Sequence, residues 1–170
     1  MNSSWIQYGI YFLGIVLLQG LVINHIGIGP YAYPMIYTML LIVLPFEINI
    51  IFLLGIALLL GVSVDMLSDT FGLHTSSSIF IAYVRPALLN ALKPRDGYDD
   101  NQMPTVHDMG FAWYAAYAGI FIVLHHTWFF VLEIFRFDMV GLILLKIIVS
   151  SLLSFVILMG LQFLLYKSSR

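Results

Sequence analysis

The sequence predicts an all-α membrane protein, a polytopic bundle of apolar helices that forms one domain over residues 1–170. The first reason is composition: 61% of the residues are hydrophobic and only 9% are charged. A soluble domain typically has about 25% charged residues. The second reason is four stretches without Asp, Glu, Lys or Arg, at residues 1–46, 48–64, 109–132 and 147–166. Each approaches or exceeds the about 20 apolar residues with which a helix crosses a bilayer.

Composition also excludes several functions. The net charge is only -2 and no basic cluster is dense enough to bind nucleic acid. The absence of cysteine excludes disulfides, iron–sulfur clusters and thiolate zinc sites. No phosphate-binding, nucleophile-elbow or dinucleotide motif occurs, so we predict no catalytic residue, cofactor or metal site.

The first predicted helix covers residues 5–24, and its flanks lack the basic region and cleavage site of a signal peptide. The segment HIGIGPYAYP, with two glycines and two prolines, ends this helix and predicts a turn at the membrane interface. The next thirty residues would span about 45 Å as one helix, too long for one crossing and too short for two. Pro45 offers a break. Either two helices, at residues 34–44 and 47–64, or one kinked helix results.

GVSVDMLSDTFGLH, residues 61–74, forms the corner to the second half of the chain. The polar segment 93–108 predicts a loop, with PTVHD as an extended lead into the next helix. A short turn is expected at residues 136–138. Three helices are predicted around these segments, at residues 75–92, 110–133 and 139–166.

Basic residues predict the orientation in the membrane. The loop 93–108 contains Lys93 and Arg95, and the C-terminal tail contains Lys167 and Arg170. Because such residues mark the cytoplasmic side, we expect both segments there and the corner 61–74 on the outer side. Six spans would place the N-terminus in the cytoplasm, whereas five would place it outside. An external signal from an N-terminal reporter would exclude six spans.

The acidic pair of the corner has two interpretations. Asp65 and Asp69 are four residues apart, so on a helix they share a face, and acids inside a membrane often mark proton or ion pathways. Alternatively they end a helix, where Gly72 supplies the turn and Ser68, Asp69 and Thr70 satisfy loose backbone groups. The predicted position at the outer end of a helix favours the second interpretation.

Two histidines lie in the middle of an apolar helix. His125 and His126 point about 100° apart, so they are poorly placed to bind one metal, and hydrogen bonds to a neighbouring helix are favoured. Glu133 shares a face with His126 and is expected to lie at the interface near Arg136. Lys146 either extends outward along its methylene stem or pairs with Glu133.

Several further residues are expected to determine how the helices pack. Arg85 either reaches the cytoplasmic surface or pairs with Asp96. Residues 76–78, a run of serines, together with Gly55 and Gly61, have small side chains that allow helices to approach closely.

Three stretches together resemble the MreD family of rod shape-determining membrane proteins: GVSVDMLSDTFGLH, YVRPALLNALKPRDGYD and TVHDMGFAWYAAYAGIFIVLHHTWFFVLEIF. The resemblance covers nearly the whole chain. It implies a multi-pass protein of the bacterial inner membrane, without enzymatic activity, in the machinery that inserts peptidoglycan along the side wall. It further implies pairing with MreC and, through MreC, with the actin-like MreB, the RodA polymerase and the elongation transpeptidase.

The family's helical arrangement is similar to that of the S components of energy-coupling-factor transporters. That similarity implies six helices with both termini cytoplasmic, and it favours the two-helix alternative around Pro45. It also supplies a second function, the binding of a vitamin in an outward-facing pocket. Candidates for that pocket are Asp65, Asp69, His74 and Trp128. The first helix has Gly9, Gly14 and Gly20 in place of the A-x-x-x-A spacing of S components.

We therefore predict a scaffold of the cell-wall elongation complex that holds the membrane helix of MreC, with a vitamin-binding transporter subunit as the alternative. The candidate pocket-rim or partner-contact residues are Asp65, Asp69, Gly72, His74, Arg85, Arg95, Asp96, His126 and Glu133. Replacing Arg95 and Asp96 with alanine is expected to weaken complex assembly.

Overall fold

A computed structural model describes residues 2–26, 29–99 and 102–165 of the chain. Within these residues all regular structure is helical, which confirms the predicted class. The elements are α1 (Asn2–Leu17), the π-helix η1 (Leu18–Val22), the 3-10 helix η2 (Ile23–His25), α2 (Thr38–Ile42), α3 (Ile50–Ser68), α4 (Leu73–Ala91), α5 (Val106–Met109), α6 (Phe111–Ile134), the 3-10 helix η3 (Phe137–Met139) and α7 (Val140–Leu165).

Three helices of the described chain, α3, α6 and α7, are long and apolar enough to cross a membrane. The first helix continues through η1 and η2 to His25, close to its predicted end. PTVHD is only partly extended, because Thr105 accepts a hydrogen bond from the amide of Asp108 and starts the short helix α5. The predicted six spans and cytoplasmic termini remain predictions.

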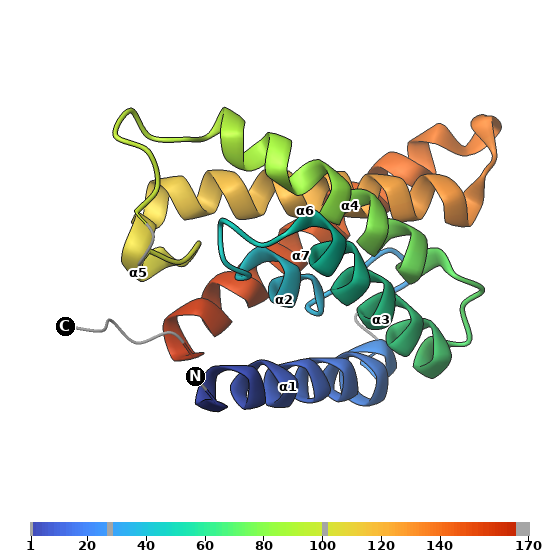
Figure 1. Cartoon of the computed structure of the whole chain (residues 1–170). Coiled ribbons are helices and arrows are strands. Elements are labelled where there is room, and N and C mark those ends of the chain that lie inside the picture. Colours follow the sequence, from blue (N-terminus) through green and yellow to red (C-terminus); the bar gives the residue numbers. More distant parts are fainter. Residues whose placement is uncertain (1, 27–28, 100–101, 166–170) are drawn as a thin grey trace.

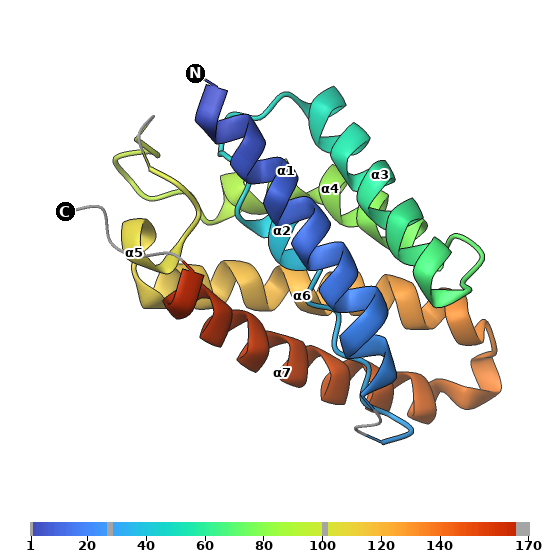
Figure 2. The same ribbon diagram turned by 90° about the horizontal axis from the view of Figure 1, so that it is seen from below.

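The helices run between two ends of the bundle (Figures 1 and 2). The start of α1, the segment between α4 and α5, and the end of α7 lie at one end. The turns from α3 to α4 and from α6 to α7, and the segment after η2, lie at the opposite end, here called the corner end. The loop 93–108 is therefore far from the corner 61–74.

Helix α7 presents apolar side chains outward and polar ones inward. Leu144, Ile148, Leu152 and Val156 recur every fourth residue and are 52%, 57%, 62% and 66% exposed. The serines at 150, 151 and 154 are buried on the inner face. A surface helix of a soluble protein has the reverse pattern, so this pattern fits a helix surrounded by lipid.

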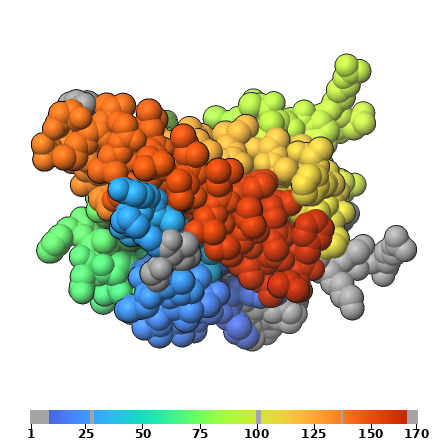
Figure 3. Space-filling model, turned by 180° about the vertical axis from the view of Figure 1, so that it is seen from behind, coloured from blue at the N-terminus to red at the C-terminus, as the bar shows by residue number. Residues whose placement is uncertain are grey.

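Residues 29–44 lie between α1 and α3 in the chain. Residues 35–44 are buried inside the bundle, which differs from the turn predicted at the membrane interface. Figure 3 shows part of this segment, in light blue, beside the orange-red α7. The Tyr33 amide donates to Ser150 Oγ at 3.0 Å, and the Met35 amide donates to Ser154 Oγ at 2.9 Å. Irregular backbone is tolerated at membrane depth where protein groups satisfy it in this way. The two-helix alternative is correct at Pro45, but α2 has only 5 residues, because side chains of η1 and α7 hold residues 33–36 of the preceding segment in an irregular backbone.

Only one of the two glycines predicted to permit close helix packing, Gly61, does so within the described chain. A Cβ atom at Gly61 would collide with the backbone of Thr75, so this glycine permits the close approach of α3 and α4. A Cβ at Gly20 would similarly meet Leu67. Gly55 and Gly14 face open space, so the predicted packing role of Gly55 is wrong within the described chain.

Candidate functional site

The corner between α3 and α4 is built by two residues with left-handed backbone. Asp69 (φ 51°) ends α3, and Gly72 (φ 82°) precedes the first residue of α4. Glycine adopts this conformation without steric cost, and Asp is among the few other residues that visit it. The corner sequence therefore supplies suitable residues at both positions, and Gly72 occupies the predicted turn.

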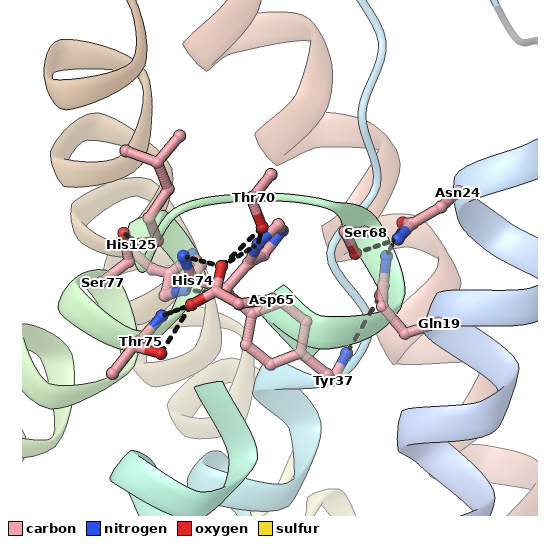
Figure 4. Close-up of polar contacts among 11 residues, drawn as sticks. Gln19, Asn24, Tyr37, Asp65, Ser68, Thr70, His74, Thr75, Ser77 and His125 are labelled. Carbon is pink, nitrogen blue, oxygen red and sulfur yellow. Dashed lines mark hydrogen bonds and ion pairs between the residues drawn. The ribbon is translucent and has the colours of Figure 1, made fainter. Parts of the chain in front are cut away.

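Asp65, in the last turn of α3, closes this corner (Figure 4). One carboxylate oxygen, Oδ1, accepts hydrogen bonds from the Thr70 hydroxyl (2.5 Å), the His74 amide (3.0 Å) and His74 Nδ1 (3.0 Å). The other, Oδ2, accepts from the amide and the hydroxyl of Thr75 at 2.9 and 2.5 Å. The first amides of a helix lack intrahelical partners, and negative charge is favoured beside them. Asp65 thus caps α4 from the preceding helix.

Asp69 plays a different part from Asp65. Asp69 lies beyond the end of α3 and is exposed to solvent, whereas Asp65 is buried, with 7% of its surface exposed. The expectation that the two carboxylates share one helix face is therefore wrong, because the left-handed backbone at Asp69 ends the helical repeat.

His74 is oriented by Asp65. The two side chains are 3.0 Å apart between Nδ1 and Oδ1, and the His74 side chain is 7% exposed. Its ring packs against Tyr37 and Phe129, with ring centroids 5.6 and 4.7 Å away. With the Nδ1 proton directed to Asp65, a neutral His74 has its lone pair on Nε2.

Sequence reasoning missed Gln19, which links η1 to the irregular segment. Its Oε1 accepts from the Ile36 amide at 2.8 Å, and its Nε2 donates to the Pro34 carbonyl at 3.0 Å. The same Nε2 donates to Asn24, whose amide nitrogen donates to Ser68 Oγ at 2.6 Å. The available signal was a glutamine inside an apolar helix, since polar residues in such helices usually face a partner.

These groups surround a cavity of about 520 Å³ at the corner end. Asp69, His74 and Glu133 are the predicted site residues that line it. Asp65, Gly72 and His126 are not among the lining residues. The other lining residues are Gln19, Ile23, Asn24, His25, Ile26, Gly29, Ala32, Tyr33, Pro34, Met35, Leu67, Ser68, Thr70 and Phe129.

The two central histidines bind neighbouring segments, as expected. His125 Nε2 lies 2.7 Å from the Tyr37 hydroxyl, and His126 Nε2 lies 3.1 Å from Ser154 Oγ of α7. The described residues contain no group of three His, Cys, Asp or Glu side chains placed to hold a metal ion.

The ion pairs near the turn from α6 to α7 show which partners Lys146 and Arg136 have. Lys146 Nζ donates to Glu133 at 2.8 Å, which is the pairing alternative for Lys146. The expected approach of Glu133 to Arg136 is wrong, because Arg136 instead pairs with Asp138 at 2.7 Å. Lys146 Nζ also lies 4.9 Å from the centroid of the Tyr33 ring.

Arg85 neither reaches the surface nor pairs with Asp96, which corrects both expectations. The residue is 1% exposed. Its guanidinium donates to the Tyr117 hydroxyl at 2.9 Å and to the carbonyls of Leu44 and Pro45, where the chain leaves α2. A cation is favoured at the carbonyl end of a helix, so the break at Pro45 provides the partners that hold Arg85 inside.

The remaining candidates lie apart from the cavity. Arg95 and Asp96 are exposed in the loop at the opposite end of the bundle. Nearby Tyr98 stacks on Phe46 at a centroid distance of 4.0 Å, and partial burial raises the pKa of its phenol. Trp128 donates to Ser76 Oγ at 2.9 Å, and it does not line the cavity.

Comparison of the chain with protein-family models, with curated proteins and with solved structures finds no match. Function must therefore be argued from the residues and their arrangement.

Proposed function

We propose that this chain is a non-enzymatic scaffold of the bacterial cell-wall elongation complex, a multi-pass protein of the inner membrane that binds the single membrane helix of MreC. Through MreC it would connect to MreB, RodA and the elongation transpeptidase, and so contribute to rod shape and to the regulation of peptidoglycan synthesis. The resemblance of three stretches of sequence to MreD suggests this role.

The structural observation that supports a scaffold most is an apolar groove of about 320 Å³ between α1, α2 and α7. Figure 2 shows α2 lying between the diverging α1 and α7. Its lining residues are Ile10, Tyr11, Gly14, Ile15, Leu18, Met39, Leu40, Val43, Leu161 and Leu165. No side chain in this set is charged. Since α7 is long and apolar enough to span the bilayer, the groove suits a transmembrane helix.

Gly14 makes close approach of such a helix feasible. A Cβ atom at Gly14 would meet nothing within 4 Å, so the groove is open at this position. In membranes, helices associate mainly through van der Waals packing and hydrogen bonds, for which small residues let the backbones approach. The arrangement of the polar groups agrees with a structural role, because Asp65 and Arg85 are both engaged at helix ends.

The affinity-tagged full-length chain, purified from its own membranes, tests this proposal through the amount of MreC recovered. Gly14→Leu fills the groove and is expected to reduce recovery by about tenfold, since a side chain that cannot pack costs about 1–3 kcal/mol. Gly9→Leu is the matched control, because Gly9 lies on α1, faces open space and is absent from the groove. Equal recovery with both variants, or no MreC with the unaltered chain, would contradict the proposal.

The exposed loop offers a second contact for the same complex. Arg95 and Asp96 are accessible there. Their joint replacement with alanine is expected to reduce recovery of MreB while the membrane contact with MreC persists. Full recovery of MreB together with normal rod shape would contradict a contact between this loop and the cytoplasmic partners.

The cavity at the corner end favours one alternative function, a vitamin-binding S component of a transporter. Its volume of about 520 Å³ lies within the about 300–1,000 Å³ typical of small-molecule sites. Native mass spectrometry of the purified chain distinguishes the two proposals. A retained vitamin, together with uptake that depends on ATPase subunits, would favour the transporter subunit over the scaffold.

A further inference from the structure

Helix α2 forms one wall of the groove that the scaffold proposal assigns to MreC. Met39, Leu40 and Val43, here called the groove floor, line the groove from this helix and its end. The helix has only 5 residues. An isolated helix shorter than about 12 residues is at best marginally stable. The position of the groove floor therefore depends on contacts that other parts of the chain make with α2 and its flanks.

A glutamine from the first helix holds the beginning of α2. Gln19 Oε1 accepts from the amides of Ile36 and Tyr37, at 2.8 and 3.4 Å, and Tyr37 directly precedes the helix. Gln19 Nε2 donates to the carbonyl of Pro34 at 3.0 Å. Amides at the start of a helix have no acceptor within it, and Gln19 supplies one. Because Leu18 lines the groove and Gln19 follows it, η1 contributes both a groove wall and a contact that holds the groove floor.

Helices α6 and α7 hold the same flank of α2. His125 Nε2 of α6 lies 2.7 Å from the Tyr37 hydroxyl, and Ser154 Oγ of α7 accepts from the Met35 amide at 2.9 Å. Ser154 Oγ also lies 3.1 Å from His126 Nε2, which orients the hydroxyl. All three side chains, those of His125, His126 and Ser154, are buried. The two central histidines therefore act on the segment that leads into the groove floor.

A buried cation holds the end of α2. Arg85 donates to the carbonyls of Leu44 and Pro45, which follow the helix. Tyr117 of α6 donates to the carbonyl of Ile42 at 3.3 Å and accepts from Arg85 Nε at 2.9 Å. The last carbonyls of a helix have no donor within it. Both ends of α2 are thus held by side chains from other helices.

We propose that Gln19 and Arg85 are positioning residues for the groove, which hold the groove floor in place so that a partner helix meets a preformed surface. Neither residue is among those that line the groove. A preformed site loses less conformational entropy on binding than one that must first become ordered. The inference rests on the scaffold proposal for the identity of the partner, whereas the placement of the groove floor is measured on the chain alone.

Hydrogen–deuterium exchange of the full-length chain in detergent measures whether the groove floor is held. Gln19→Met keeps a side chain of similar length and removes its hydrogen-bonding groups. Residues 36–44 are expected to exchange about tenfold faster, because the Ile36 and Tyr37 amides lose their acceptor. Exchange in α3, α6 and α7 is expected to stay unchanged. Unchanged exchange at residues 36–44, or equally faster exchange throughout the chain, would overturn the proposal.

Gln162→Met is the matched control. Gln19 and Gln162 are 1% and 0% exposed, and each accepts from a buried backbone amide. Gln162 Oε1, however, accepts from the Val106 amide of α5 at 3.3 Å, and Gln162 is outside the groove lining. This variant is expected to speed exchange at residues 105–109 and not at 36–44. Equal acceleration at residues 36–44 by both variants would contradict a specific contact of Gln19 with this segment.

Recovery of MreC with the affinity-tagged chain tests the consequence for the partner. Gln19→Met is expected to reduce recovery about fivefold, because fewer molecules have the groove floor in place. Gln162→Met is expected to leave recovery unchanged. Full recovery with Gln19→Met, despite faster exchange of the groove floor, would overturn the positioning role and leave the scaffold proposal intact. Absence of MreC from the unaltered chain would contradict the scaffold proposal alone, because the exchange rates decide independently whether Gln19 holds the groove floor.

Tyr117→Phe tests the other end of α2 without removing the buried cation, whose loss is expected to cost much of the protein's stability. The variant takes away the donor to the Ile42 carbonyl and the acceptor that orients Arg85. Residues 42–44 are expected to exchange about threefold faster, with a smaller loss of MreC than for Gln19→Met. Unchanged exchange at residues 42–44 would overturn the positioning role at this end.

Discussion

Asp65 and Arg85 each place a buried charge beside a helix end, but at helix ends of opposite polarity. Asp65 accepts from the first amides of α4, and Arg85 donates to carbonyls where the chain leaves α2. Both arrangements follow the sign of the helix dipole, with an anion at the amide end and a cation at the carbonyl end.

The surroundings of these two charges differ. Arg85 is buried in the core, where its guanidinium donates to backbone carbonyls and to the Tyr117 hydroxyl. Asp65 also holds His74, which lines a cavity. An internal charge in an apolar bundle can therefore be purely structural, as at Arg85, or can hold a second polar group at the wall of a cavity, as at Asp65.

The largest effect is expected from Arg85→Met. It leaves the carbonyls of Leu44 and Pro45 without their donor, and breaking such a buried charged network costs about 3–5 kcal/mol. The measurements are the folded fraction by size exclusion and the unfolding free energy by titration with SDS. Arg136→Met is the control, because Arg136 is 59% exposed in its side chain. Equal stability of the two variants would refute the structural role of Arg85.

Asp65→Asn is expected to have the next largest effect. In asparagine an NH₂ group replaces one carboxylate oxygen, so a donor would face the N–H and O–H donors that Asp65 now accepts from. The loss of these charged hydrogen bonds is expected to lower the unfolding free energy by about 2–3 kcal/mol. The same SDS titration measures this loss. Asp69→Asn is the control and is expected to leave stability nearly unchanged, since Asp69 is exposed. Two equally destabilised variants would mean that the corner is held by its total charge rather than by the Asp65 hydrogen bonds.

Gly61→Ala tests the contact that brings the Asp65 carboxylate to α4. The new methyl group would collide with the Thr75 backbone, and overpacking of this kind costs about 1–3 kcal/mol. Gly55→Ala, on the same helix but in open space, is expected to be neutral or slightly stabilising. Thermal unfolding midpoints in one detergent compare the two variants. A neutral Gly61→Ala would show that α3 and α4 are not in close contact at this position.

The smallest effect is expected from Glu133→Gln, which removes the ion pair with Lys146. The Glu133 side chain is 31% exposed, so the loss is expected to stay below about 1 kcal/mol and to shrink as salt is added. Unfolding midpoints at low and high ionic strength measure it, with Asp138→Asn as the exposed control. A large decrease in the unfolding midpoint that does not depend on salt would contradict this, and would show that the Glu133–Lys146 pair is as important for stability as the buried charges.

Much of the corner was predictable from sequence because local chemistry decides it. Gly72 provides a positive φ, and polar groups cluster where a helix ends. Asp65 and His74, however, are nine residues apart, and their contact depends on α4 folding back against α3. The cavity depends on the segment after η2, whose backbone is fixed by Gln19 and by serines of α7 more than 100 positions away.

The sequence by itself determined the helical class and the approximate positions of the three long apolar helices, because apolar length acts locally. It left open whether Pro45 separates two helices or kinks one, and the structure shows two. Only the tertiary structure decided the partners of the polar side chains. Arg85 has a stem long enough to reach either the surface or the interior, and sequence spacing cannot choose between them. The unsatisfied carbonyls after α2 make that choice, because buried backbone groups require donors wherever the packed helices place them.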